Sequence, residues 1–233
     1  MAAGVAARGQ TLAGSSTILA LHSTSDFTLA ALLRNDRVVA RAGLESGRAS
    51  IRLAGAIEQM LAEGRIGARE VGVIAVCVGP GSFTGIKVGL ATAYGLAAAT
   101  GAVVFGADSL EILAEQAPAS EAVAAVFPAG RGDFYLAVFE ARGGAARRQA
   151  IVTPRLATAA ELVGFVGGQQ VLTLGADVRA AGLSNARAAQ PERLALDLAA
   201  LAARCAFFDA GTLPAPVYLR RTWAEEVRSK RAP

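Results

Sequence analysis

The chain has 233 residues, of which 53% are hydrophobic and 18% charged, and its formal net charge at pH 7 is +4. This length and apolar content suit one compact domain or two small ones with a real core. No apolar run reaches the roughly 18 residues that a membrane-spanning helix needs. Two cysteines without a CxxC pattern argue for a reducing compartment and against a bound metal. From the cysteines and the lack of a long apolar run together, we expect a cytoplasmic protein without a membrane span.

Four segments are expected along the chain. Residues 1–16 are rich in Ala, Gly and Ser, and we expect a disordered leader there rather than a signal peptide. Residues 17–108 and 109–223 are expected to form two lobes. Residues 224–233 contain the basic run Arg228-Ser229-Lys230-Arg231. This tail could contact RNA or an acidic partner, although a solvated chain end is the simpler interpretation.

The first half of the chain alternates strand and helix patterns. Three short apolar segments separated by Asn, Asp and Ser turns predict an antiparallel meander. A helix, a buried strand, a second helix and a further strand follow. These elements are expected at residues 18–22, 27–33, 38–42, 50–63, 73–78, 86–99 and 103–105.

The second half repeats that order after a connecting helix at residues 109–116. Strands are expected at 122–127, 134–140, 149–153 and 171–174, and helices at 158–166 and 191–208. Thr158 is the expected N-cap of the first of these helices. A twice-repeated βββαβα unit is the plan of actin, Hsp70 and the sugar kinases, which consists of two ribonuclease-H-like lobes. The sequence therefore predicts an α/β fold of this kind.

A glycine-rich turn, Gly79 to Gly85, joins the buried strand to the second helix. It does not match a P-loop, because Lys87 and Val88 stand in the wrong places. The dinucleotide pattern G-x-G-x-x-G fails by one residue, and Pro80 breaks the G-x-S-x-G pattern of serine hydrolases. We therefore favour a turn that orients a helix over a nucleotide or nucleophile site.

Gly85, Gly89, Ala93 and Ala97 recur every four residues in the helix after this turn. They form one stripe of very small side chains, which would let another backbone come close. The rest of the helix is also largely apolar, so we expect burial on nearly all sides. Either a second protein covers the side away from the sheet, or the chain has a larger core of its own.

The run GPGSFTGIKVGLATAYGLAAATG, residues 79–101, resembles the GPGSFTGxRxG-x-ATAKGLA pattern of the TsaB (YeaZ) family of bacterial tRNA-modification proteins. The likeness continues through residues 103–106 and 108–111, which are similar to the family's VVGVSSLE. The resemblance covers residues 17–223 in the order of the expected elements, and it is strong in sequence over residues 71–113. The segment Pro216 to Arg220 is also similar to the family's closing motif.

The resemblance implies the same two-lobed fold and a subunit that is not itself an enzyme. Such a subunit serves as a scaffold for N6-threonylcarbamoyladenosine formation at position 37 of tRNA. It binds the TsaD transferase and, with it, the TsaE ATPase, and it forms a homodimer in isolation. ATP and metal are expected in those partners, with no catalytic residue, cofactor or metal in this chain. Contact with tRNA is expected only through the complex.

The family's partners meet the two helices of the first lobe, so the resemblance and the small-residue stripe predict one interface. We expect an apolar surface on both helices around that stripe. The predicted interface residues are Leu53, Ile57, Leu61, Gly85, Gly89, Leu90, Ala93, Tyr94 and Ala97.

Three positions depart from the family pattern and leave partner binding open. His22 stands where the family has a strand-end Asp, Ala49 where its first helix opens with His, and Pro128 where a hairpin begins with Asp. An imidazole cannot replace a carboxylate as a ligand of Mg²⁺. We expect His22 to have a hydrogen-bond partner. The alternative function is a nucleotide-using or peptidase-like enzyme of the same fold.

Overall fold

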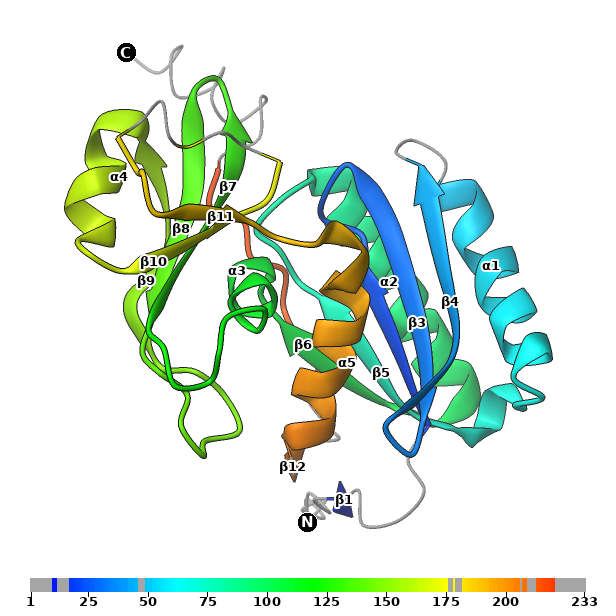
Figure 1. Cartoon of the computed structure of the whole chain (residues 1–233). Helices are drawn as coiled ribbons and strands as arrows, with labels where there is room; N and C mark the ends of the chain where they lie inside the picture. Colours follow the sequence, from blue (N-terminus) through cyan, green and yellow to red (C-terminus); the bar gives the residue numbers. More distant parts are fainter. Residues whose placement is uncertain are drawn as a thin grey trace, which may run out of the picture.

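The computed structural model describes residues 10–11, 17–45, 49–175, 178, 182–205, 207–208 and 213–220. Two five-stranded sheets face each other across a pair of helices, α3 and α5, and further helices cover the outer face of each sheet (Figure 1). The predicted α/β class is confirmed. The layers alternate helix, sheet, helix, sheet and helix, so each sheet is covered by helices on both faces.

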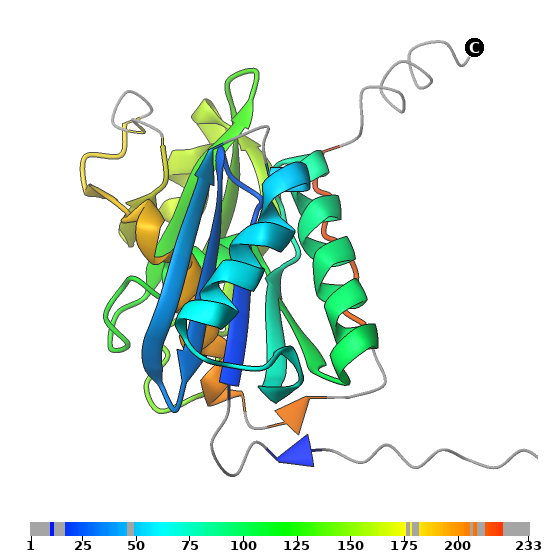
Figure 2. The ribbon, with the colours of Figure 1, turned by 90° about the vertical axis from the view of Figure 1, so that its right-hand side faces the viewer.

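The first sheet has the strand order β4-β3-β2-β5-β6. Its first three strands form the predicted antiparallel meander, and β5 and β6 continue the sheet in parallel beside β2. Two helices, α1 and α2, lie side by side over one face (Figure 2). The elements are β2 (Thr17–His22), β3 (Phe27–Arg34), β4 (Arg37–Glu45), α1 (Ala49–Glu63), η1 (Ala68–Glu70), β5 (Val71–Cys77), α2 (Phe83–Thr100) and β6 (Val103–Ala107).

The second sheet has the order β11-β10-β7-β8-β9, and α4 covers its outer face. The short strand β11 was not predicted, because its residues Ala-Arg-Ala carry no strand pattern. The elements are α3 (Ser109–Ala114), β7 (Val123–Gly130), β8 (Asp133–Phe139), β9 (Ala150–Thr158), α4 (Ala159–Val166), β10 (Gln170–Thr173), β11 (Ala186–Ala188), η3 (Pro191–Arg193) and α5 (Leu194–Arg204).

Strand β2 is buried on both faces. Leu19 and Leu21 pack with α1 and α2, whereas Ile18 and Ala20 belong to the central core with α3 and α5. This alternation follows from the period of two along a strand. A β2 buried on both sides explains why its sequence is a continuous apolar run.

The last helix is shorter than the sequence suggested. We predicted one helix from residue 191 to 208, but α5 ends at Arg204 and Cys205 is already extended, with φ −81° and ψ 94°. Phe207–Phe208, β12, pairs instead with Gln10–Thr11, β1. The apolar run therefore continues past the helix as a strand, which periodicity alone could not separate.

The two chain ends are only partly described. Within the predicted leader, Gln10–Thr11 forms β1, and the other residues before Thr17 lie outside the described part. The predicted basic tail, 224–233, also lies outside it. Among the helices that the structure describes, none is long and apolar enough to cross a membrane.

Candidate functional site

The glycine turn between β5 and α2 packs against the turn that follows β2. The Ser82 N–H donates to the Thr24 carbonyl oxygen at 2.8 Å, and a Cβ at Gly81 would lie 2.2 Å from that same oxygen. Gly79 has φ +102°, which favours glycine, and its carbonyl accepts from the Ser109 N–H. The close approach that these glycines permit is therefore to the chain's own backbone.

The backbone groups at the start of α2 also find their hydrogen-bond partners within the chain. Ser82 caps the helix, because its Oγ accepts from the Gly85 N–H at 3.2 Å. Ser23 Oγ donates to the Gly85 carbonyl at 2.7 Å. A Cβ at Gly85 would lie 1.7 Å from the Ser23 carbonyl oxygen, and one at Gly89 would lie 2.4 Å from Ser23 Oγ. The helix start thus lies directly on the end of β2.

The first three members of the small-residue stripe, which we predicted at an interface with a second protein, pack against the chain itself. Gly85 and Gly89 face Ser23, and Ala93 has no exposed surface. Ala97 is partly buried against the same core. A stripe of small residues indicates close packing, and here the packed partner is the chain's own sheet. A large side chain at either position, as in Gly89→Leu or Ala93→Trp, would therefore disrupt the folded monomer.

Three of the larger predicted interface residues are buried within the chain, and two are partly buried. Leu53, Ile57 and Leu90 are 2%, 3% and 6% exposed and belong to the core between the helices and the first sheet. Leu61 and Tyr94 are partly buried there. The apolar positions of an amphipathic helix face the core, so their spacing marks the side away from a partner.

The outward side of α2 has an unusual composition. Apart from Phe83 and Lys87 its exposed residues are small, and Lys87 carries the one charge. A Cβ at Gly95 would meet nothing within 4 Å, and the same holds for Gly55 on the outward side of α1. Ile51, at the start of α1, is 83% exposed. The exposed α2 residues are Ser82 at its cap and Phe83, Thr84, Lys87, Ala91, Gly95, Ala98 and Ala99.

Replacement of either of two glycines in α2 by alanine should change the free energy of unfolding in opposite directions. Gly85→Ala is expected to lower the free energy of unfolding by about 3 kcal/mol, because the new methyl overlaps the Ser23 carbonyl. Gly95→Ala is expected to raise it by about 1 kcal/mol, because a helical glycine is replaced in open space. Urea unfolding of both variants tests the orientation of α2. Equal changes in the free energy of unfolding would contradict that orientation.

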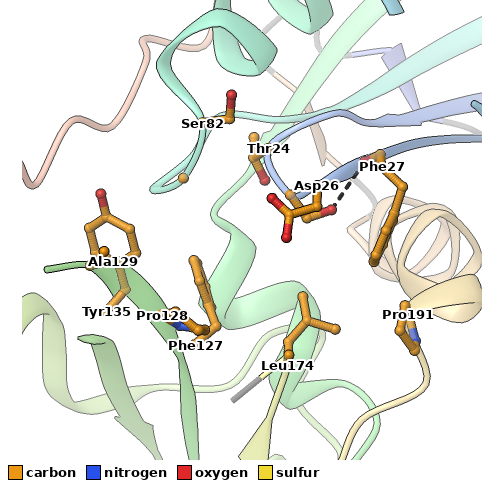
Figure 3. A pocket seen from close by; sticks show the side chains of 14 residues that line it. Thr24, Asp26, Phe27, Ser82, Phe127, Pro128, Ala129, Tyr135, Leu174 and Pro191 are labelled. Carbon is orange, nitrogen blue, oxygen red and sulfur yellow. Dashed lines mark hydrogen bonds between the residues drawn. The ribbon is translucent and has the colours of Figure 1, made fainter. Parts of the chain in front are cut away.

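A cleft of about 440 Å³ opens between the two sheets, next to the glycine turn (Figure 3). Its first-lobe side is the turn Thr24 to Phe27 with Gly81 and Ser82. Apolar side chains from the second lobe form the other side. Among the described residues that line the cleft, Asp26 is the one acidic residue, and none is Lys, Arg or His. The second-lobe lining consists of Phe127, Pro128, Ala129, Gly130, Tyr135, Leu174, Gly175 and Pro191.

The groups that line the cleft do not suit a metal-bound nucleotide. A phosphate needs cations or free N–H groups, and the Ser82 N–H at the glycine turn already donates to Thr24. Mg²⁺ needs oxygen ligands, and the last residue of β2 is His22, whose imidazole offers none. The described residues also contain no group of three His, Cys, Asp or Glu side chains placed to bind a metal.

The two candidate nucleophiles in this region are engaged or buried. Burial raises the pKa of the Cys77 thiol to about 12, and its sulfur lies 3.2 Å from Thr24 Oγ1. Ser82 Oγ caps α2, and the only histidine of the chain, His22, has no contact with it among the described hydrogen bonds. Neither of these two groups is therefore placed as an activated nucleophile.

His22 itself differs from the prediction. It is 1% exposed, and neither ring nitrogen has a hydrogen-bond partner within the described part of the chain. The expected partner is therefore absent there. Burial favours the uncharged imidazole and lowers the pKa of His22 to about 4. Of the other departures, Pro128 is exposed at the rim of the cleft and Ala49 is the first residue of α1.

The buried histidine should make the fold sensitive to acid. The unfolded chain protonates His22 near pH 6.5 and the folded chain only near pH 4, so stability falls as the pH drops through that window. The loss attributable to His22 is up to about 3 kcal/mol. Asp108 and Asp197, whose pKa values burial raises to about 6, act in the opposite direction.

Comparison with His22→Leu therefore isolates the effect. The difference in unfolding free energy between the two proteins should be constant above pH 7 and should move in favour of the variant as the pH falls from 6.5 to 4. Urea unfolding at several pH values measures it. Parallel pH profiles for the two proteins would show that His22 is solvated or paired.

The protein-family model described as "TsaD: tRNA N6-adenosine threonylcarbamoyltransferase" matches residues 45–210. The tRNA threonylcarbamoyladenosine biosynthesis protein TsaB of Bacillus subtilis is 33% identical over 132 residues. That match covers 55% of this chain and 57% of the Bacillus protein, so it spans little more than half of either.

Two solved structures from Pseudomonas aeruginosa have the same fold. One is described as an uncharacterized protein with similarity to peptidase YEAZ, with a TM-score of 0.71 and 26% identity. The other is YeaZ, with a TM-score of 0.70 and 24% identity. Each match covers 88% of this chain and 100% of the other. The predicted two-lobed fold is confirmed by these likenesses.

Proposed function

This chain belongs to the TsaB (YeaZ) family, within the wider group that the TsaD model describes, and we propose that it is a non-catalytic scaffold subunit of a tRNA threonylcarbamoyladenosine-forming complex. Its partners in this proposal are a TsaD-like transferase and, with it, a TsaE-like ATPase. In isolation the chain forms a homodimer through the same surface. It reaches tRNA only through the assembled complex.

One observation carries the proposal: the outward side of α1 and α2 contains glycines that the chain's own packing does not require. Gly55 and Gly95 lie in helix interiors, where glycine costs about 1 kcal/mol relative to alanine. Neither has an atom within 4 Å of where its Cβ would be. Glycine is favoured at such positions when another backbone must come close.

The charge pattern of α2 supports the same conclusion. A solvent-facing side of a helix normally carries several charged residues, but Lys87 is the only one on α2. Ala91, Gly95, Ala98 and Ala99 leave a shallow surface instead. Depletion of charge at the centre of a contact patch is typical of specific interfaces. We therefore place the interface on the outward side of both helices, in place of the inward residues first predicted.

The cleft supports a role without catalysis by this chain. Among the described residues that line it there is one carboxylate and no cation, Ser82 Oγ is engaged in capping α2, and the glycine turn is closed on Thr24. A nucleotide-using or peptidase-like enzyme would need a cation or an activated nucleophile there. Turnover of ATP or of a peptide by the purified chain alone, lost on mutation of Ser82 or Asp26, would contradict the non-catalytic part of the proposal.

A charged side chain on the outward side of α2 should prevent association. Gly95→Arg points into open space in the monomer, so the fold should survive. In the complex the same side chain would occupy the position of the partner's backbone, and the affinity for the cognate TsaD-like subunit should fall at least about thirtyfold. Isothermal titration calorimetry measures the affinity, and size-exclusion chromatography with light scattering measures the homodimer.

Ala160→Arg is the matched control, because Ala160 is an exposed helical residue on α4 in the other lobe. It should bind the TsaD-like subunit as the unmodified chain does. Unimpaired binding by Gly95→Arg, with the control unchanged, would remove α2 from the interface. Loss of binding by both variants would point to an effect of charge rather than of position.

A further inference from the structure

The segment Leu213–Arg220, which we call the strap, runs beside α2 along the side away from α1 (Figure 2). At one end the Tyr94 hydroxyl donates to the Pro214 carbonyl. Further along, the Val217 N–H donates to the Val78 carbonyl at 2.8 Å. The strap therefore runs antiparallel to α2 and reaches the start of that helix.

At the start of α2 the strap places an aromatic ring beside another. The rings of Tyr218 and Phe83 have their centroids 5.0 Å apart at an interplanar angle of 42°. The Lys87 ammonium lies 4.0 Å from the centroid of the Phe83 ring, which is a cation–π contact. We call Phe83, Tyr218 and Lys87 the aromatic platform.

The platform is exposed although it is built largely from apolar groups. Phe83 is 42% exposed and Tyr218 is 44% exposed. Scattered exposed apolar residues need no explanation, but these two rings are in contact and come from distant parts of the sequence. Aromatic residues are the type most often found at the energetic centre of interfaces.

The platform is also held in place before any partner binds. Tyr218 lies between two anchors of the strap, the Val217 N–H and the guanidinium of Arg220. Arg220 donates to the Ala129 carbonyl at 2.8 Å and pairs with Asp133 of the β7–β8 hairpin. A contact surface that is already rigid loses little conformational entropy on binding, which favours affinity.

The charge of the platform indicates which chemical group a binding partner should place beside it. Among the described residues, no carboxylate lies within ion-pair distance of Lys87. Lys87 is also one helical turn from Ala91 and two from Gly95, with all three on the exposed side of α2. The platform thus continues the proposed partner surface and adds to it a cation that no described carboxylate neutralises.

We propose that the aromatic platform is the recognition end of this surface. The TsaD-like subunit places an apolar side chain against the rings of Phe83 and Tyr218 and a carboxylate beside Lys87. The inference rests on the proposed function and extends the contact from the two helices to the strap. A stack of RNA bases on the rings is less favoured, because Lys87 is the only cation on the exposed side of α2 to neutralise phosphates.

Truncation of each ring should test this directly. Phe83→Ala and Tyr218→Ala, in the full chain, are each expected to weaken binding of the cognate TsaD-like subunit at least tenfold in calorimetry. The loss in the double variant should be smaller than the product of the single losses, because the rings contact each other. Tyr218→Phe keeps the ring and should bind normally. Lys87→Met should weaken binding at low salt and much less at high salt.

Ile151→Ala is the control, because it removes an apolar side chain that is 54% exposed on the second lobe, and it should leave the affinity unchanged. Urea unfolding of every variant separates loss of contact from loss of fold. Normal binding by folded Phe83→Ala and Tyr218→Ala, with Gly95→Arg still impaired, overturns the platform and leaves the proposed function intact. Normal binding by Gly95→Arg as well overturns both.

Two further results would also overturn the platform as a site for the TsaD-like subunit. One is a loss of self-association in light scattering while heterodimer affinity is unchanged, which would assign the rings to a second copy. The other is a loss of binding to fluorescently labelled tRNA by the isolated chain, with heterodimer affinity unchanged, which would assign them to RNA.

Discussion

The contact between the start of α2 and the end of β2 fixes the rest of the molecule's interaction surface. Gly85 and Gly89 allow the helix to lie on Ser23, and the Ser23 hydroxyl joins the two by its bond to the Gly85 carbonyl. Because this contact sets the rotation of α2 about its axis, it turns Leu90 and Ala93 into the core and leaves Ala91 and Gly95 outside. The same packing brings the glycine turn against Thr24, whose carbonyl accepts from the Ser82 N–H. The orientation of α2 and the closure of the glycine turn thus both depend on packing against the end of β2.

The sequence predicted the succession of elements because hydrophobic periodicity and turn residues agree along most of the chain. The continuous apolar strand 73–78 and the Thr158 cap are examples, and both lie within one or two residues of the observed elements. The orientation of α2 was not predictable in the same way. A stripe of small residues shows that some backbone comes close, but the same stripe fits the chain's own sheet and a second protein equally well. An exposed glycine such as Gly95 becomes informative only once the structure shows that nothing surrounds it.

Other features depend on contacts between residues far apart in the sequence. His22 was expected to have a partner, because a buried imidazole normally has one, and its surroundings could be known only from the packing of both sheets. The pairing of Phe83 with Tyr218 joins a motif to the segment after α5, 135 positions further along the chain. The strap as a whole carries no periodic pattern. The contact between the two rings and the course of the strap are the features on which the platform rests.

Hydrogen–deuterium exchange of the full chain, with and without the cognate TsaD-like subunit, tests the central claim most directly. We expect binding to slow exchange in the backbone amides of α1, α2 and the strap, while exchange in the β7–β8 hairpin and the lining of the cleft changes little. Protection confined to the cleft or to the second lobe, with α2 unchanged, would show that the outward side of this helix is not where a partner binds.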